Sequence, residues 1–216
     1  MNGFDFTLAG ARLTALGSGA LWWQDQRTLC VSDLHLGKAE RHARRGGSAL
    51  PPYETRDTLD RLEAALDATC AETLICLGDS FDDDAACRAL PGAEQTRIAR
   101  LMQNRRWIWI EGNHDPAPPV LGGEHRAELT LGPLTFRHIA DPQESAEISG
   151  HYHPKARIRG TSRPCFLLDR DRLILPAFGT YTGGLRSSDS AFARLMAQDA
   201  LAILTGPKPL PVPMPR

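Results

Sequence analysis

Short apolar runs and helical patterns alternate along the first half of the chain. A continuous apolar run is typical of a strand in a sheet covered on both faces, and an apolar position that recurs every three to four residues predicts a helix. The strands predicted in this way cover residues 4–8, 11–16, 20–23, 28–31, 73–77 and 107–110, and the helices cover 53–69 and about 93–103. Strands that alternate with helices form an α/β sheet, which carries its ligands beyond the carboxyl ends of its strands.

The second half of the chain differs because its apolar segments come in pairs joined by turns, as at Gly132-Pro133 and at Arg170-Asp171. Its predicted elements are hairpins over 128–137 and 166–175, a strand over 146–148, and a helix followed by a short strand within 191–204. Hairpins join antiparallel strands, so we expect a second sheet that packs on the first.

The length of 216 residues fits one domain with a core of its own. We expect this domain to cover residues 1–205. Residues 206–216 contain five prolines in eleven positions, and proline is excluded from helix interiors and central strands. The last segment is therefore predicted to be an extended, proline-rich arm.

Charge and cysteine content narrow the class of protein. The 25 basic and 26 acidic residues nearly cancel, so binding to nucleic acid would need a local basic patch. The cysteines are odd in number, show no Cys-x-x-Cys spacing, and stand at positions 30, 70, 76, 87 and 165. We interpret them as reduced, structural thiols. Because no apolar run could span a bilayer and the N-terminus has no secretory pattern, we expect a cytoplasmic protein without membrane contact.

Polar residues with metal-binding side chains stand where the predicted strands end. In chain order they form Asp33-x-His35, Gly78-Asp79-x-x-Asp82, Gly112-Asn113-His114-Asp115, the single His138, and Gly150-His151-x-His153. Residues two apart share a face of an extended chain, so Asp33 and His35 can point at one spot. Carboxylate, imidazole and amide donors suit Mn²⁺, Fe or Zn²⁺. The candidate donors are too many for one ion and suggest two ions that share a bridging carboxylate.

The ordered blocks resemble the signature of the calcineurin-like metallophosphoesterase superfamily, and every defining residue of that signature is present between positions 33 and 153. The resemblance implies a four-layer α/β/β/α sandwich of two mixed sheets flanked by helices. It also implies a metal centre in which Asp33, His35 and His153 bind one ion, Asn113, His138 and His151 bind the other, and Asp79 bridges them. We expect two divalent ions, with Mn²⁺ ahead of Fe and Zn²⁺.

The same resemblance implies the chemistry. A metal-bridging hydroxide would attack a phosphodiester, and His114 would contact the phosphate and protonate the leaving oxygen as general acid. Asp115 would orient His114, and Asp82 would support the ligands from outside the coordination sphere. A non-catalytic protein-binding scaffold of the same fold is an alternative, but that branch loses the catalytic histidine, which this chain keeps.

A closer resemblance covers nearly the whole chain and is to the small bacterial ligase-associated DNA damage response endonucleases. It rests on Ser32 to Lys38, Gly46-Gly47 and Pro51-Pro52 around a basic stretch, Gly150 to Pro154, Leu175 to Gly179, and Thr182 to Gly184. These proteins are associated with a DNA ligase, a helicase and an exonuclease, which implies DNA as substrate and a nuclease role in DNA repair. The alternative with the same chemistry is a small-molecule phosphoesterase acting on nucleotides, cyclic nucleotides or sugar-nucleotide diphosphates.

A basic segment follows the first block, with candidate phosphate contacts at Lys38, Arg41, Arg44 and Arg45. These residues would form a rim that binds the phosphates flanking the scissile one, and a solvated face of the same composition is the alternative. Arg157, Arg159 and Arg163 would continue the rim. Tyr181, which stands among glycines, either shapes the wall of the pocket or closes a turn.

Overall fold

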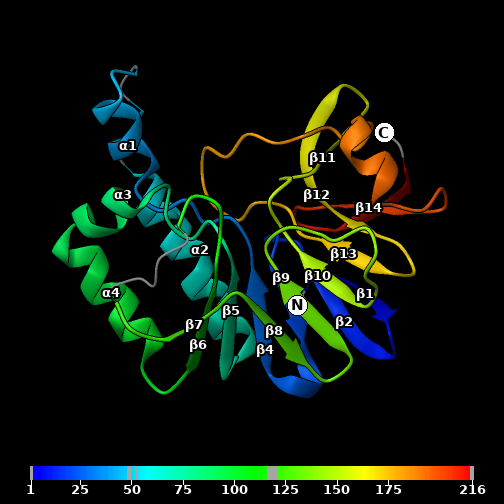
Figure 1. The fold of residues 1–216 in the computed structure, drawn as a ribbon, viewed down its shortest axis with the longest axis horizontal. Helices are drawn as coiled ribbons and strands as arrows, with labels where there is room; N and C mark the ends of the chain where they lie inside the picture. The colour runs from blue at the N-terminus through cyan, green and yellow to red at the C-terminus, as the bar shows by residue number, and fades with distance from the viewer. Residues whose placement is uncertain (1, 48–49, 52, 116–120, 215–216) are drawn as a thin grey trace.

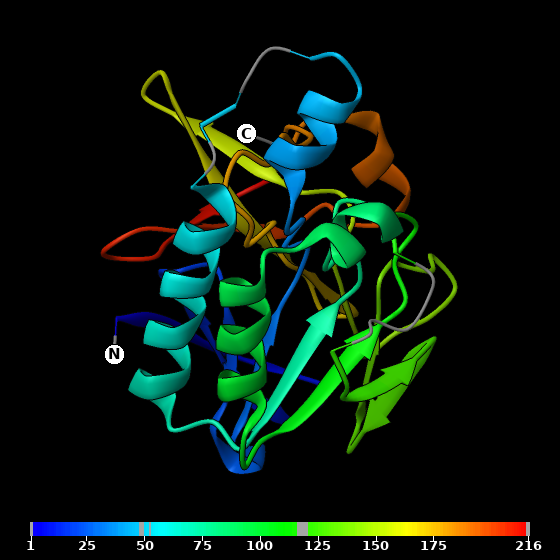
Figure 2. The ribbon, with the colours of Figure 1, turned by 90° about the vertical axis from the view of Figure 1, so that its left-hand side faces the viewer.

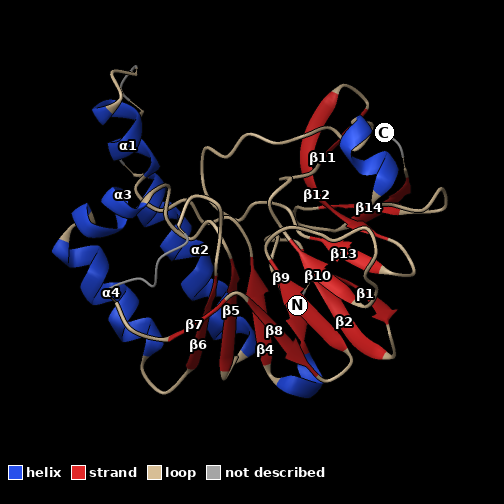
Figure 3. Ribbon diagram, in the orientation of Figure 1, coloured by secondary structure: helices blue, strands red, loops and turns tan. Residues whose placement is uncertain are grey.

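A computed structural model of the chain describes residues 2–47, 50–51, 53–115 and 121–214. Two β-sheets lie face to face, and the longer helices gather on the outer side of one of them (Figure 1, Figure 3). The helices are α1 (Lys38–Arg44), α2 (Glu54–Thr69), α3 (Asp84–Ala89) and α4 (Gly92–Met102), with the short 3₁₀ helices η1 (Gln24–Gln26) and η2 (Ser190–Arg194). Figure 2 shows α2 and α4 side by side against the first sheet.

The first sheet has the strand order β1-β2-β3-β4-β5-β6-β7. Its strands are β1 (Gly3–Leu8), β2 (Ala11–Leu16), β3 (Leu21–Trp23), β4 (Thr28–Val31), β5 (Thr73–Leu77), β6 (Arg106–Ile110) and β7 (Glu124–Arg126). The strands from β4 onward are parallel, with Val31 paired to Cys76 and Leu77 paired to Ile110. The residues that follow β4, β5 and β6 therefore leave the sheet at one edge, which brings blocks far apart in the sequence together.

The second sheet has the strand order β15-β14-β12-β13-β10-β9-β8. Its strands are β8 (Glu128–Leu131), β9 (Leu134–Arg137), β10 (Glu147–Ser149), β12 (Thr161–Leu168), β13 (Arg172–Ile174), β14 (Leu201–Leu204) and β15 (Leu210–Pro213), and β11 (Lys155–Ile158) pairs with β12. The hairpins β8–β9 and β12–β13 are antiparallel, as predicted. The interior strand β10 is parallel to both of its neighbours, β9 and β13, so the sheet is mixed.

Apolar cores separate the layers. One core lies between the first sheet and its helices, where α2 buries Leu59, Leu62 and Leu66 on the face that its sequence pattern predicts. A second core fills the space between the two sheets, and a third covers the outer side of the second sheet with Phe192 of η2. This arrangement is the predicted α/β/β/α sandwich. Its outer helical layer on the second sheet is reduced, within the described ranges, to η2.

Some segments differ from the elements predicted for them. The helix expected within 191–204 is limited to the 3₁₀ helix η2, and the short strand after it is β14. Part of the segment expected to be an arm forms β15, an edge strand paired with β14. Proline is tolerated there because an edge strand needs N–H donors on one side only. The sequence does not predict α3, β7 or β11, which are too short to show a period, and the boundary between 1–205 and 206–216 stays a prediction.

The cysteines are free thiols, and all of them except Cys70 are buried. Burial raises the pKa of the Cys165 thiol to about 12, which keeps it protonated and unreactive. This agrees with the structural role expected from their spacing. None of the helices in the described part of the chain has the length and apolar character required to cross a membrane.

Candidate active site

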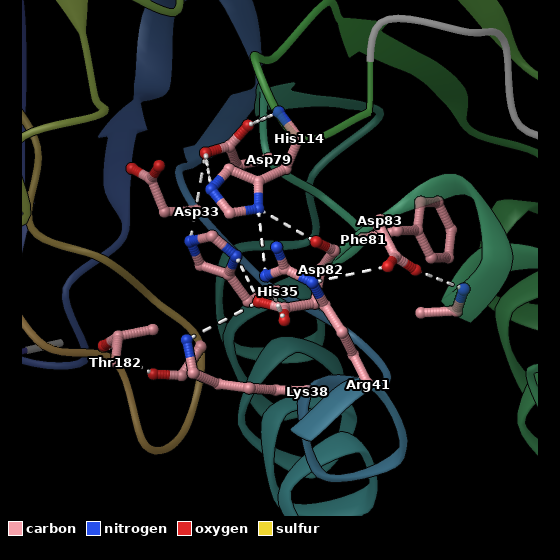
Figure 4. A network of polar contacts seen from close by, with 12 residues as sticks. Asp33, His35, Lys38, Arg41, Asp79, Phe81, Asp82, Asp83, His114 and Thr182 are labelled. Carbon is pink, nitrogen blue, oxygen red and sulfur yellow. Dashed lines mark hydrogen bonds and ion pairs between the residues drawn. The ribbon is translucent and has the colours of Figure 1, made fainter. Parts of the chain in front are cut away.

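The candidate metal ligands meet at the edge where the parallel strands end. Asp33 and His35 follow β4, Asp79 follows β5, Asn113 follows β6, His138 follows β9, and His151 and His153 follow β10. Figure 4 shows Asp33, His35 and Asp79 close together beside His114. Both sheets contribute side chains, so the site exists only where the two sheets meet.

The first ligand group consists of Asp33, His35 and His153, whose ligand atoms all lie within 4.8 Å of one another. Nε2 of His153 is 3.3 Å from Nε2 of His35 and 3.1 Å from Oδ1 of Asp33. Two donors bound to one ion at about 2.1 Å stand roughly 3.0–3.4 Å apart, so this spacing fits a shared cation. Two imidazole nitrogens that face each other can share one proton at most, and a cation between them satisfies both.

The second ligand group consists of Asp79, His138 and His151. Nε2 of His138 is 3.4 Å from Oδ2 of Asp79 and 3.2 Å from Nδ1 of His151. The same nitrogen is 3.0 Å from Oδ1 of Asn113. These are again separations expected of donors around one ion, so the amide of Asn113 lies with the group to which the resemblance assigns it.

Asp79 stands between the two groups. Its Oδ2 is 3.4 Å from Nε2 of His138 in the second group and 4.0 Å from Nε2 of His35 in the first. Its Oδ1 accepts a 2.9 Å hydrogen bond from the backbone N–H of His114. Although burial opposes its ionisation, the contacts with His138 and His114 hold the pKa of Asp79 at about 2. An ionised carboxylate in this position is able to bridge two ions.

Polar contacts outside the two groups set the direction of two histidine rings. Nδ1 of His35 is 2.9 Å from Oδ1 of Asp82, and Nδ1 of His138 is 2.9 Å from the carbonyl oxygen of Leu77. The carbonyl oxygen of Leu77 accepts the Nδ1 proton of His138, and the carboxylate of Asp82 lies in an ion-pair contact with Nδ1 of His35. Nε2 of each ring therefore faces the ligand groups. Burial opposes the charge of Asp82, but hydrogen bonds from His35 and Arg41 hold its pKa well below the ordinary value.

The backbone at the ligands adopts an uncommon conformation. The angle φ is positive at Asp33 (53°), His35 (44°), Asp79 (45°), His151 (69°) and His153 (46°). Left-handed residues other than glycine cluster at functional sites, where the surrounding structure holds them. Glycines in the same blocks allow close approach, since a Cβ on Gly150 would lie 1.7 Å from Oγ of Ser32 and one on Gly78 would lie 2.5 Å from Cγ of His138. The sequence patterns reveal neither this strain nor Ser32, whose hydroxyl donates to Oδ2 of Asp33.

The ring of His114 lies beside both groups and reaches the solvent. Its Nε2 is 3.9 Å from Oδ2 of Asp79, and its side chain is 29% exposed. Its Nδ1 is 2.9 Å from the carbonyl oxygen of Asp82, which accepts the Nδ1 proton and leaves Nε2 for a ligand. A phosphate that binds at both groups would therefore lie next to Nε2 of His114.

The ligand blocks and the fold match a known family. Residues 26–182 match the profile of the family described as Calcineurin-like phosphoesterase. The chain belongs to this family. A crystal structure of Pseudomonas putida nuclease MPE is similar over 98% of this chain and 100% of that chain, with 29% sequence identity and a TM-score of 0.79. A comparison with curated proteins finds no match.

The matched region of this phosphoesterase domain includes every candidate ligand and His114. The family and the nuclease neighbour support a hydrolase that depends on metal for the cleavage of phosphate esters. The family uses two divalent ions, and the two ligand groups described above could hold them.

Asp115 lies in a different place from the one that the resemblance implies. In this phosphoesterase domain its carboxylate is buried and accepts a 3.0 Å hydrogen bond from the backbone N–H of Phe81. Burial raises the pKa of Asp115 to about 7. The oxygen that faces Nδ1 of His114 is the carbonyl oxygen of Asp82, not a carboxylate oxygen of Asp115. Asp115 therefore fixes the loop after β5, and the backbone of that loop orients the ring.

The predicted substrate rim divides into two parts along α1. Lys38 and Arg41 point into the phosphoesterase site, where Nζ of Lys38 and Nη1 of Arg41 are 3.5 Å and 2.8 Å from the carboxylate of Asp82 (Figure 4). Nη1 of Arg41 is also 3.4 Å from Nδ1 of His114. These two residues are therefore neighbours of the candidate reacting groups, and their partner is a carboxylate of the site itself.

The remaining basic residues lie farther along α1 or on another element. Arg44 is 3.0 Å from Glu40 and 2.9 Å from Asp83, and Arg45 is exposed at the end of α1. The other three arginines, Arg157, Arg159 and Arg163, belong to the β11–β12 hairpin, which stands on the opposite side of Figure 1 from α1. The two basic segments are thus separate and do not form one continuous rim.

Proposed function

We propose that the chain is a dinuclear phosphodiesterase that cleaves nucleic acid, with His114 as its general acid. The observation that carries the proposal is the pair of ligand groups joined by Asp79, with Nε2 of His114 3.9 Å from the shared carboxylate. The likeness to a nuclease over nearly the full length of both chains supports nucleic acid as the substrate.

The residues of the site would hold the ions, place the phosphate and transfer a proton to the leaving oxygen. Two divalent ions, when bound, would supply positive charge for the phosphate and acidify the water that attacks it. The residues that would hold them are Asp33, His35 and His153 for one ion, Asn113, His138 and His151 for the other, and Asp79 for both. As an imidazolium, His114 would give its Nε2 proton to the leaving oxygen and keep the Nδ1 proton, which the carbonyl oxygen of Asp82 accepts. Lys38 and Arg41 would add positive charge beside the phosphate.

The mixed nitrogen and oxygen donors lead us to propose Mn²⁺ as the resident ion, and Fe and Zn²⁺ suit the same donors. The resemblance to the ligase-associated endonucleases extends the proposal to a cytoplasmic DNA repair nuclease. In that role it would work with a DNA ligase, a helicase and an exonuclease.

The proposal is tested with protein that has been stripped of metal and reconstituted with Mn²⁺, on bis-p-nitrophenyl phosphate and on oligonucleotides. We expect turnover of both substrates. We expect His114→Ala to lower kcat about 100- to 10,000-fold, the usual contribution of a general acid, without loss of bound metal. His125→Ala, which changes a histidine on β7 outside the ligand groups, is the matched control and should leave kcat unchanged.

Each outcome of this assay has a separate meaning. Absence of turnover with two ions bound would contradict the proposal of an enzyme and favour a non-catalytic scaffold of the same fold. Turnover of bis-p-nitrophenyl phosphate without cleavage of oligonucleotides would favour a small-molecule phosphoesterase. Turnover in Fe or Zn²⁺ but not in Mn²⁺ would correct the ion and keep the reaction.

A further inference from the structure

Two tyrosine rings meet where the loop after β13 reaches the start of α2, and the chemistry proposed above uses neither of them. Tyr53, the residue before α2, is 54% exposed. Its ring centroid is 5.8 Å from that of Tyr181, and the two ring planes are tilted by 55°. Tyr181 is half-buried, so the open ring of Tyr53 offers an apolar face to a ligand and Tyr181 supports that ring.

The loop that carries Tyr181 is anchored at both ends to the first ligand group. The N–H of Gly179 donates a 3.0 Å hydrogen bond to the carbonyl oxygen of Asp33. At the other end, Gly184 packs so closely that a Cβ would lie 1.9 Å from the carbonyl oxygen of His153. Tyr181 stands between these two anchors with φ at 62°, a conformation that the surrounding structure must impose. The position of its ring is therefore tied to the position of two metal ligands.

Tyr53 is anchored to the same group from the side of α2. Oγ1 of Thr55, two residues along, accepts a 3.0 Å hydrogen bond from the N–H of Gly37. Gly37 in turn lies two residues beyond the ligand His35. Both tyrosines are thus linked to the segments that carry the first ligand group by hydrogen bonds of residues two positions away from them.

Further hydrogen bonds hold the Tyr181 loop on α2. Oγ1 of Thr180 donates to Oδ2 of Asp57 at 2.5 Å, and its N–H donates to Oγ1 of Thr58 at 3.1 Å. Nη2 of Arg61 donates to the carbonyl oxygen of Phe178 at 2.6 Å. The aromatic pair therefore rests on one connected support and does not need to be ordered when a ligand arrives.

Two lysines supply positive charge at the metal centre and at this loop. Lys38 reaches Asp82 with a side chain that is 26% exposed, and Nζ of Lys155 donates to the carbonyl oxygen of Thr182 at 3.1 Å. Single-stranded nucleic acid is bound by surfaces of this kind, in which aromatic rings take the bases and cations follow the phosphates.

We propose that Tyr53 and Tyr181 form a stacking subsite for the base of a nucleotide next to the scissile phosphate. This inference rests on the proposed function, because it assumes that the phosphate bound by the metal centre belongs to a nucleic acid. The occupant is an unpaired base, since the faces of a base in a duplex are already covered by its neighbours. The subsite would thus give the enzyme a preference for single-stranded or locally opened substrate.

The test measures the binding of a short single-stranded oligonucleotide that carries one 2-aminopurine, whose fluorescence falls when it stacks. The protein is metal-loaded and carries His114→Ala, so that cleavage is slow. Tyr53→Leu and Tyr181→Leu should each weaken binding about 5- to 100-fold, the loss expected for one base stack, and should abolish the quenching. Tyr53→Phe and Tyr181→Phe keep the rings and should bind as before. Leu210→Ala, which removes a side chain of similar exposure (45%) on β15, is the control.

A second measurement on protein with both tyrosines intact avoids dependence on variants that fail to fold. An abasic residue is moved along the oligonucleotide one position at a time. We expect one position at which the missing base weakens binding as much as the leucine substitutions do. Equal affinity at every position would overturn the subsite.

The outcomes separate this inference from the proposed function. If the unaltered protein hydrolyses bis-p-nitrophenyl phosphate but neither binds nor cleaves an oligonucleotide, both the nucleic-acid substrate and the subsite are wrong. If it binds and cleaves oligonucleotides but the leucine and phenylalanine variants bind equally well, the subsite alone is wrong. In that case Tyr53 and Tyr181 only pack against each other at the edge of the site.

Discussion

At the scale of single residues, the site depends on Asp82, whose side chain contacts one functional ring and whose backbone contacts another. Asp82 is buried, with its carboxylate against Nδ1 of His35 and its carbonyl oxygen against Nδ1 of His114. Lys38 and Arg41 approach the same carboxylate from α1. One residue therefore sets the direction of a candidate metal ligand and of the proposed general acid.

We expect Asp82→Asn to weaken Mn²⁺ binding about 10- to 100-fold, the usual effect of changing an outer residue that orients a ligating histidine. His35 would lose its charged acceptor, and Arg41 would lose the ion pair that keeps it near His114. Calorimetric titration of metal-free protein with Mn²⁺ measures the change. Asp84→Asn, in the first turn of α3, is the control, and an unchanged affinity in Asp82→Asn would mean that His35 is oriented without this charge.

The sequence is informative about residues whose role follows from the type of donor atom and its place after a strand. Asp33, His35 and His153 fall into one group because their blocks follow strands that end at the same edge. The contacts of Asp115 and Arg41 could not be foreseen, since each depends on which loop the side chain meets after the strands are aligned. The local sequence does not predict such tertiary contacts.

At the scale of elements, the two long helices on the first sheet are joined by a cluster of ion pairs. Nη2 of Arg97 on α4 is 2.6 Å from Oε2 of Glu63 on α2, and its Nη1 also contacts Asp60. Arg100 reaches the other oxygen of Glu63 at 2.6 Å. Hydrogen bonds from Arg97 and Arg100 lower the pKa of Glu63 although partial burial opposes this.

We expect Arg97→Ala to lower the free energy of unfolding by about 1 kcal/mol at neutral pH, because a partly exposed ion-pair network contributes little more. The pKa of Glu63 is lowered in the folded protein, so its contribution is present above the ordinary value of 4.5 and is lost as the pH falls below it. Urea unfolding at pH 7 and at about pH 4 should therefore show a smaller difference between the two proteins in acid. Arg100→Ala, whose side chain is 60% exposed, should cost less, and a pH-independent difference would exclude the role of Glu63.

Elements with a continuous apolar run, such as β4 and β5, were the easiest to predict, because both of their faces are covered. The position of β10 was not predictable, since its partners β9 and β13 are both parallel to it. Parallel pairing needs a crossover connection and leaves no turn between the paired strands. Turn residues therefore predict the hairpins of the second sheet, whereas the strand predicted over 146–148 has no turn that would identify its partners.

At the scale of the whole molecule, each ligand group draws on both sheets. Asp33 and His35 leave the first sheet and His153 leaves the second, and Asp79 of the first sheet likewise meets His138 of the second. An ion in either group would add a further connection between two layers that already meet through an apolar core and through hydrogen bonds such as that between His138 and Leu77. Metal binding should therefore stabilise the packing of one sheet on the other.

Removal of metal with a chelator should lower Tm by about 5–10 °C when the ion had been present at roughly 100 times its Kd, which corresponds to about 3 kcal/mol. Differential scanning calorimetry of the metal-loaded and chelated protein measures the shift. His138→Ala, which removes one ligand of the second group, should show a smaller shift on chelation. Equal Tm values with and without metal would mean that the ions do not hold the sheets together.

The edge strand β15 of the second sheet limits the pairing of this sheet with strands of other molecules. The N–H of Met214 donates to the carbonyl oxygen of Ala200. The backbone N–H groups of the alternate residues Val212 and Leu210 therefore point toward β14 as well. Pro211 and Pro213 then occupy the positions that face outward, and neither has an N–H to donate. A strand from a neighbouring chain would find carbonyl acceptors on this edge but few donors, and it could not complete a ladder there. The prolines that keep β15 from being a central strand thus protect this edge of the sheet from edge-to-edge aggregation.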